Sequence, residues 1–140
     1  MSLPLNDLHA DFPALMLAND IFGASGSSRL WKRVRETDGL SYDVRSGVTW
    51  SSFDANSGWR VSAIFAPQNQ PRVETAFNEE LARSLKDGFT QQEVDAAKTS
   101  LLKSRQLNRA QDGIVSAVLA NNLERQRTFA SSQRVDDALA

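Results

Sequence analysis

The chain has 140 residues, which is enough for one domain with a hydrophobic core. Its formal net charge is −1, so no overall field favours nucleic acid or an anionic membrane, and the lack of cysteine excludes disulfides and thiolate metal sites. No apolar run approaches the roughly 20 residues of a membrane span, and residues 1–5 have no signal-peptide pattern. We therefore expect no nucleic-acid partner and no membrane span, and the compartment stays open.

Two helices are predicted before residue 40. The first begins at Phe12–Pro13 and ends at Gly23. The second is short and basic, with Ser27 or Ser28 as its N-cap and Gly39 as its stop. Its cations, with one from the next strand, form either a nucleic-acid patch or one charged helix face, and the interspersed acidic residues favour the charged face. These cations are Arg29, Lys32, Arg33, Arg35 and Arg45.

A β-hairpin is predicted to follow. From residue 41 the apolar period changes from 3.6 to 2, which indicates a half-buried strand with Tyr42 and Val44 on the same side. A second alternating run covers residues 59–65, after a turn at residues 54–58. The two runs therefore predict an antiparallel pair of strands.

Helices are predicted for the rest of the chain. Pro71 opens a helix whose apolar residues recur every fourth position, namely Val73, Phe77, Leu81 and Leu85. Thr90 and Glu93 form a capping box for the next helix, which runs to about residue 111. A further helix covers residues 114–123, and Asp112-Gly113 breaks or kinks the chain before it.

Both ends of the chain look incomplete. After a polar loop at residues 125–132, a last helix is predicted to begin at Gln133 and stop after one turn, which is not stable alone. A hairpin of two strands likewise needs a third strand. We expect a domain that is truncated at both ends. Residues 1–10 would be a leader or cloning remnant, whose first three residues have no structural role, and residues 11–140 a partial domain.

Few side chains could carry catalysis. His9 is the only histidine and lies in a polar stretch, so we expect a surface histidine and no metal site within the chain. The carboxylate pairs Glu79-Glu80 and Asp136-Asp137 are adjacent in sequence. Neighbours on a helix point about 100° apart, so we expect solvated charges rather than acid–base pairs.

One pair of residues has greater chemical interest. Arg35 lies in the last turn of the basic helix, Tyr42 begins the strand, and the chain reverses between them at Gly39. A guanidinium and a phenol that converge at this corner could hold a peptide carbonyl or an oxyanion formed from it. Alternatively, Arg35 stabilises the C-terminus of its helix and Tyr42 packs in the sheet, and the residues alone favour this structural interpretation.

Several motifs follow one another in a fixed order. They are Asn19-Asp20-Ile21-Phe22-Gly23, Ser28-Arg29-Leu30, Val34-Arg35-Glu36, Gly39-Leu40-Ser41-Tyr42-Asp43-Val44 and Gly88-Phe89-Thr90-Gln91-Gln92-Glu93-Val94, with Lys98 after them. This order resembles the C-terminal-type domain of the pitrilysin/insulinase family of zinc metallopeptidases, which includes the mitochondrial processing peptidase. The resemblance covers roughly Asp11 to Ala140.

The resemblance implies an α+β domain with an antiparallel-rich sheet and helices packed on one face. In this family two related halves close on a peptide: the N-terminal half binds zinc through His-x-x-Glu-His, and the C-terminal half contributes an arginine and a tyrosine seven residues apart. Arg35 and Tyr42 match that spacing, which implies that they bind substrate. No His-x-x-Glu-His occurs here, so zinc is expected only in the other half of the parent enzyme, and this chain alone is expected to be inactive.

The implied function is the substrate-binding and structural half of a zinc-dependent metalloendopeptidase. Its implied partners are an extended peptide and the zinc-binding half of the same protein. A non-catalytic scaffold of the same fold, like the core proteins of the respiratory bc complex, and a generic peptide-binding module are the alternatives. A sheet edge left open by truncation would also favour self-association.

Overall fold

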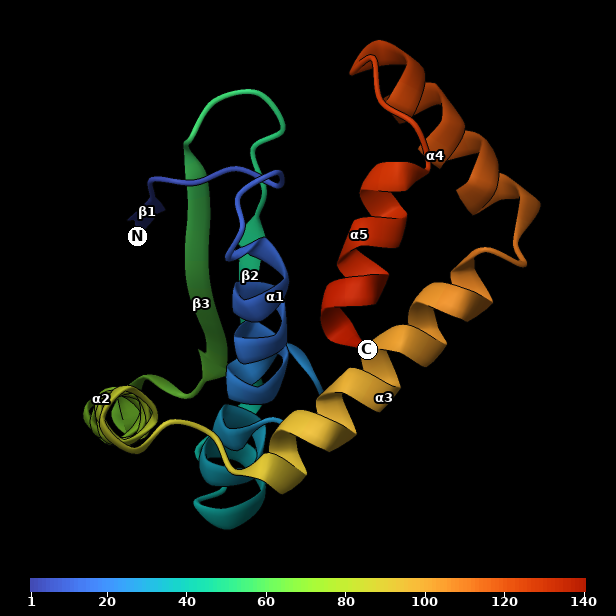
Figure 1. The fold of residues 1–140 in the computed structure, drawn as a ribbon. Coiled ribbons are helices and arrows are strands. Elements are labelled where there is room, and N and C mark those ends of the chain that lie inside the picture. The colour runs from blue at the N-terminus through green and yellow to red at the C-terminus, as the bar shows by residue number, and fades with distance from the viewer.

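Figure 1 shows a computed structural model of residues 1–140, in which helices flank a three-stranded antiparallel sheet of order β1-β3-β2. Helix α1 lies against β2 and contacts α3 and α5, whereas α4 lies far from the sheet. The predicted α+β class is confirmed. The elements are β1 (Ser2–Leu3), α1 (Phe12–Asn19), η1 (Asp20–Ala24), η2 (Trp31–Thr37), β2 (Ser41–Thr49), β3 (Ser57–Phe65), η3 (Pro67–Asn69), α2 (Gln70–Asp87), α3 (Gln91–Asn108), α4 (Asp112–Glu124) and α5 (Ala130–Leu139).

The N-terminal residues belong to the sheet. The sequence predicts no structural role for the first three residues, yet Ser2–Leu3 forms β1 and pairs antiparallel with residues 57–58 of β3. Met1 extends this pairing, because its amine donates to the Trp59 carbonyl at 2.8 Å and its carbonyl accepts the Trp59 N–H at 2.9 Å. A two-residue strand has no alternation that a sequence pattern could reveal.

Gly23 has a different role from the predicted one. Helix α1 begins at Phe12 as predicted, but the chain stays helical through the π-helical turn η1, which ends at Ala24. A Cβ atom at Gly23 would lie 2.6 Å from Ser46 Oγ and 3.0 Å from Leu30 Cδ1. The glycine therefore allows η1 to approach β2 closely, and it does not end the helix.

The basic helix forms where it was predicted, and most of it is the π-helical segment η2. The second of the two candidate serines caps it, because Ser28 Oγ accepts the Trp31 N–H at 3.4 Å. At its end Gly39 has a φ of +59°, and the Leu40 N–H donates to the Val34 carbonyl at 2.9 Å. This left-handed turn, which favours glycine, reverses the chain into β2.

Strand β2 begins with a β-bulge at Tyr42, where two of its residues oppose one residue of β3. The Ser41 hydroxyl lies 2.6 Å from the Asp43 carbonyl and 2.8 Å from the Ile64 carbonyl, so it can donate to both and hold the bulge. Tyr42 is 77% exposed, whereas Val44 is buried. The prediction that these two side chains share one side of the strand is therefore wrong.

Beyond the bulge the two strands pair regularly as far as Thr49 and Gly58. The turn occupies residues 50–56, which is earlier in the chain than predicted, because Ser57 already belongs to β3. The buried Ser57 hydroxyl donates to the Leu5 carbonyl at 2.8 Å. This bond connects the N-terminal segment to the start of β3.

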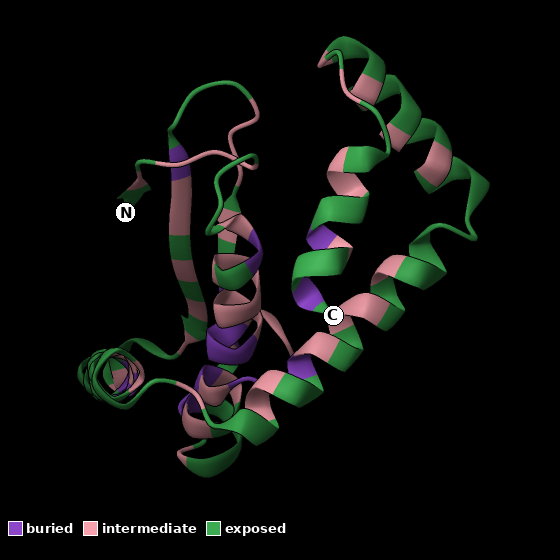
Figure 2. Ribbon diagram, viewed as in Figure 1, coloured by how far each residue is buried: buried purple, intermediate pink, exposed green.

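The hydrophobic core lies between one face of the hairpin and the segments η1, η2 and α2 (Figure 2). Its buried members are Phe22, Leu30, Val34, Leu40, Val44, Val73 and Ala76. Alternate β3 residues pack against this cluster, namely Trp59, Val61, Ala63 and Phe65. The helical segments therefore pack on one face of the sheet, as predicted.

The apolar stripe predicted on α2 is only partly buried. Val73 is buried, but Leu85 is 79% exposed. Four residues of an α-helix turn through about 400°, which is about 40° more than one full turn. Side chains spaced four apart therefore move about 40° around the helix at each step. Ala76 and Glu80 occupy the buried face instead, and Glu80 is therefore not the solvated charge that the sequence predicts.

The next helix begins as the sequence predicts. Thr90 Oγ1 accepts the Glu93 N–H at 3.2 Å and the Thr90 N–H donates to Glu93 Oε2 at 2.8 Å, which completes the capping box. Helix α3 ends at Asn108, and Asp112-Gly113 forms the first turn of α4. No helix is both long and apolar enough to cross a membrane.

Helix α5 is longer than predicted. It begins inside the predicted loop, covers the ten residues Ala130–Leu139, and buries Leu139. Asp136 forms ion pairs with Arg105 and Arg109 of α3, so it too is not a solvated charge. Burial raises the pKa of Asp136, but the hydrogen bonds from the two arginines outweigh burial and leave the pKa below its usual value. These contacts stabilise a helix that has more than the predicted single turn.

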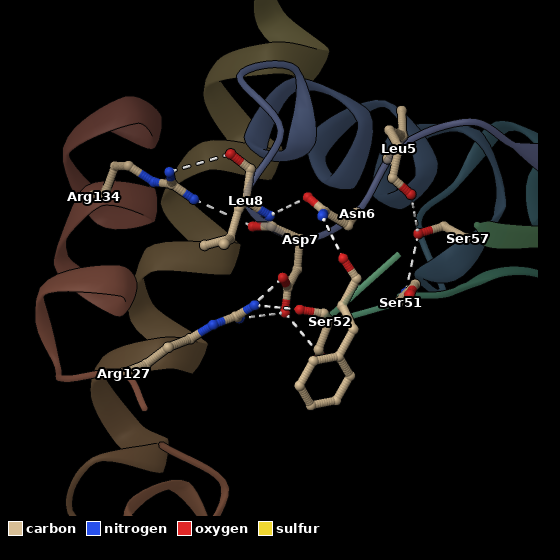
Figure 3. Close-up of polar contacts among 10 residues, drawn as sticks. Leu5, Asn6, Asp7, Leu8, Ser51, Ser52, Ser57, Arg127 and Arg134 are labelled. Carbon is tan, nitrogen blue, oxygen red and sulfur yellow. Dashed lines mark hydrogen bonds and ion pairs between the residues drawn. The ribbon is translucent and has the colours of Figure 1, made fainter. Parts of the chain in front are cut away.

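Figure 3 shows how the N-terminal segment, the hairpin loop and the α3–α5 helices are joined. Arg127 donates to the two Asp7 carboxylate oxygens at 3.0 and 2.9 Å and also to the Ser52 carbonyl. Arg134 donates to the Asp7 and Leu8 carbonyls at 3.2 Å. The Arg127 and Asp7 side chains are only 14% and 15% exposed, so this ion pair is largely removed from water.

A second ion pair joins the start of the basic helix to α3. Arg29 donates from Nε to Glu93 Oε1 at 2.8 Å and from Nη2 to Glu93 Oε2 at 2.7 Å. Its guanidinium also lies 4.8 Å from the centre of the Phe89 ring. The hydrogen bond from Arg29 is the largest influence on Glu93 and lowers its pKa from 4.5 to about 2, although burial acts in the opposite direction.

We expect this ion pair to make stability depend on pH. The pKa of Glu93 is lower in the folded chain than in the unfolded chain, so its contribution is present above about pH 4.5 and is lost as the pH falls towards 2. The measurement is urea unfolding of the unaltered chain and of Glu93→Gln across this window. The difference in unfolding free energy should be largest near neutral pH and shrink in acid, and a constant difference would contradict the assignment.

Candidate functional site

Arg35 and Tyr42 meet at the corner between η2 and β2. Arg35 lies in the last turn of η2, Gly39 reverses the chain, and the bulge turns Tyr42 outward. The Arg35 Cζ atom lies 5.5 Å from the centre of the Tyr42 ring. The structure thus brings together the two residues that the sequence singled out, through a bulge and not through regular alternation.

A third residue, Trp31, completes the contact and was not predicted. The Arg35 Cζ atom lies 4.2 Å from the centre of the Trp31 ring, closer than it lies to Tyr42. Trp31 precedes Arg35 by four residues, a spacing that places two side chains on one helix face. That spacing was the available signal, but the tryptophan was assigned only to the apolar face of the helix.

The Arg35 guanidinium makes no hydrogen bond or ion pair within the chain, although it contacts both aromatic rings. Other arginines of the basic run are already paired: Arg29 with Glu93, and Arg33 with Asp38 and Glu79. Cation–π contacts restrict a guanidinium without using its N–H groups. Arg35 is therefore held in place while all its donors stay available.

Charged neighbours surround this pair. Arg45 lies 4.9 Å from the Trp31 ring, and its Nε donates to Asp43 Oδ1 at 3.1 Å. The Trp31 indole N–H donates to Glu36 Oε1 at 3.2 Å, which fixes one edge of the ring. Arg45 is thus compensated by a carboxylate and a second carboxylate orients the tryptophan, whereas Arg35 has no acidic partner.

The donor groups at this corner suit a carbonyl oxygen or an anion. The Tyr42 hydroxyl also has no partner within the chain, and Tyr42 is 77% exposed. A forked guanidinium and a phenolic O–H together can bind an oxygen that carries a full or developing negative charge. Both groups serve here as hydrogen-bond donors, so the corner can bind and stabilise a ligand without performing hydrolysis by itself.

The side chains of this structure do not form a zinc-binding site. Catalytic zinc requires three protein ligands, and no three histidine, cysteine or acidic side chains lie together in a way that could hold a metal ion. His9 lies at the surface, where its Nδ1 accepts the Asp11 N–H at 3.1 Å. The adjacent carboxylates Glu79 and Glu80 diverge: the first pairs with Arg33 and the second, which is buried, with Arg83. They do not form an acid–base pair.

The fold is shared with solved peptidase domains. It matches the crystal structure of a peptidase M16 inactive domain from Pseudomonas fluorescens with a TM-score of 0.83 at 24% identity, covering 99% of this chain and 33% of that one. It also matches a protease from Helicobacter pylori with a TM-score of 0.84 at 18% identity, again covering 99% and 33%. These likenesses define the class: an α+β domain of the kind that occurs in peptidases.

The family model of the peptidase M16 inactive domain matches residues 1–101. A Bacillus subtilis (strain 168) protein named as the uncharacterized zinc protease YmxG is 30% identical over 94 residues, which are 67% of this chain and 22% of that protein. The chain therefore belongs to the peptidase M16 family and corresponds to its inactive domain, as its resemblance to the pitrilysin/insulinase peptidases implied. It spans only about a fifth to a third of the length of these relatives.

Proposed function

We propose that this chain is the substrate-binding half of a zinc-dependent metalloendopeptidase, which closes on an extended peptide while a separate zinc-bearing half cleaves it. The observation that carries the proposal is the Arg35 guanidinium, which two aromatic rings hold and no acidic side chain neutralises. Arg29 differs, because it satisfies its donors within the chain by pairing with Glu93. An exposed and restrained guanidinium is suited to an external ligand.

In this proposal Arg35 and Tyr42 hold the carbonyl oxygen of the scissile peptide bond. Cleavage makes that oxygen more negative, so donors placed beside it bind the transition state more strongly than the substrate. Zinc supplies Lewis acidity and an activated water in the other half. This chain contributes only binding and charge stabilisation, which agrees with a domain that has no metal ligands of its own.

The test is reconstitution. The chain would be mixed with the zinc-bearing half from the same organism, and cleavage of a fluorogenic peptide would be followed for each half and for the mixture. We expect neither half alone to cleave and the mixture to do so. A mixture that forms a complex without cleaving any peptide would contradict the enzyme proposal and identify the chain as a scaffold.

A further inference from the structure

A polar pocket lies where α3, α4 and α5 meet the N-terminal segment, and it shares no residue with the Arg35 corner. Its volume is about 210 Å³, and the loop between α4 and α5 forms part of its wall. A cavity of about 10–15 Å³ is enough for one water molecule. The pocket is therefore much larger than a site for a single bridging water, and it can hold a small molecule.

Donor groups without a partner line this pocket. The Asn122 amide nitrogen Nδ2 is buried and has no hydrogen-bond partner, and it is the only side-chain atom of the chain in that condition. The Arg125 side chain makes neither a hydrogen bond nor an ion pair, and the hydroxyls of Ser131 and Ser132 are also unpaired. Buried polar groups are normally hydrogen-bonded. The pocket therefore favours a ligand that is rich in acceptor atoms.

The pocket also has an excess of positive charge. Three arginines line it, whereas Asp7 is its only acidic residue, and Asp7 is neutralised by Arg127 (Figure 3). Asp136 pairs with two arginines of α3, of which Arg105 lines the pocket, and one carboxylate can neutralise only one of them. Arg125 has no acidic partner at all. Two positive charges therefore remain, which suits a ligand with two negative charges.

The first turn of α5 contributes in the same direction. Ser131 and Ser132 belong to this turn and line the pocket, and the turn contains no acidic residue. The N-terminus of an α-helix has a partial positive charge and favours anions. The helix terminus, the unpaired Asn122 amide and the uncompensated arginines thus surround one and the same space.

We propose that this pocket binds a phosphate dianion, either free inorganic phosphate or the phosphoryl group of a small monoester. A phosphate group has about two negative charges at neutral pH and several strong acceptor oxygens, whereas a carboxylate has one charge and two oxygens. Arg125 donates to the phosphate with all its N–H groups free, and Arg105 donates from Nη1, because its Nε and Nη2 already bond Asp136 and the Ser132 carbonyl. Asn122 Nδ2 donates to a further oxygen.

The first test is isothermal titration calorimetry of the unaltered chain with inorganic phosphate near pH 8, at constant ionic strength. We expect saturable binding to one site, competition by sulfate, and no binding of acetate. Glycerol 3-phosphate distinguishes the two sources: tighter binding than that of phosphate assigns the site to a monoester, and weaker binding assigns it to the free ion. No saturable binding of phosphate, or equal binding of acetate, would overturn the proposal.

Arg125→Ala tests the unpaired arginine. It should weaken phosphate binding by about tenfold or more, because it removes charge-assisted hydrogen bonds, and it should leave the urea midpoint without phosphate unchanged. Arg60→Ala is the matched control, since Arg60 is an exposed arginine of β3 that also makes no ion pair. Its phosphate affinity should equal that of the unaltered chain. The same loss in both variants would mean general charge attraction and would refute the site.

Asn122→Asp gives a result that a purely structural asparagine would not. The new carboxylate puts a negative charge where the phosphate binds, so the variant should not bind phosphate, and without phosphate it should unfold at a higher urea concentration than the unaltered chain. A variant that binds phosphate as tightly as the unaltered chain would show that the ion binds elsewhere. Because Arg35 and Tyr42 are untouched, these outcomes are independent of the proposed peptidase function.

Discussion

Replacing Arg35 by alanine is expected to lower peptide turnover in the reconstituted two-half enzyme by about a hundredfold, which corresponds to about 3 kcal/mol of lost transition-state stabilisation. The reason is that Arg35 is the cation at the corner whose donors are all unpaired. Tyr42→Phe, which removes a single O–H donor, should lower turnover in the same direction. The measurement is kcat and KM for a peptide substrate, together with the zinc content.

The controls separate substrate contact from folding. Zinc content should not change in either variant, because neither residue belongs to a metal site. Arg72→Ala is a matched control, since Arg72 is an exposed arginine of α2 that also makes no ion pair. Arg35→Lys keeps the charge but not the fork, and we expect it to recover only part of the activity. Unchanged kinetics in both Arg35→Ala and Tyr42→Phe would assign these residues a structural role.

Leu30→Ala is expected to lower the free energy of unfolding by about 2–5 kcal/mol, a large part of what holds a small domain together. Leu30 has no exposed surface and belongs to the core cluster, together with Phe22, Val34 and Val44. Its Cδ1 also lies close to Gly23, where η1 approaches β2. Truncation leaves a cavity that a glycine neighbour cannot fill.

Urea unfolding monitored by tryptophan fluorescence would measure this loss. The midpoint should fall while the slope of unfolding free energy against urea stays constant. Leu85→Ala makes the same chemical change at a side chain that is 79% exposed, and it should alter stability by no more than about 0.5 kcal/mol. Similar effects at both positions would contradict the burial described for α2 and the core.

Much of the fold could be predicted because its local signals are strong. The Thr90–Glu93 capping box, the serine cap before Trp31 and the left-handed glycine at position 39 are all determined by residues within one turn. The change of period from 3.6 to 2 correctly predicted the hairpin. Neighbouring residues suffice for these features because the hydrogen bonds involved span only a few positions.

The arrangement of the candidate site could be predicted only in part. The seven-residue spacing and the turn at Gly39 placed Arg35 beside Tyr42, but strict alternation placed Tyr42 on the wrong side of β2. The bulge depends on hydrogen bonds from Ser41 to carbonyls on two strands, one of them 23 residues away. A pattern within β2 cannot contain that information, nor show that Trp31 restrains the guanidinium.

The ends of the chain were predicted least well, for a related reason. Strand β1 exists only because β3 lies beside it, and α5 is stabilised by Asp136 reaching two arginines of α3. Glu80 and Asp136 were predicted to be solvated charges because the sequence around each residue does not show which residues pack against it in the folded chain. Tertiary contacts, and not helix or strand propensity, determine the secondary structure of these segments.

The Arg127–Asp7 ion pair has a consequence for the order in which the chain folds. The two residues are 120 positions apart, so the contact closes a loop that contains most of the chain. Closing such a loop costs conformational entropy of the chain. This cost is smallest after the hairpin and its core have formed, because they already order much of the loop. Helices α4 and α5 should therefore dock last and open first, so their amide protons should exchange by local opening before those of β2 and β3.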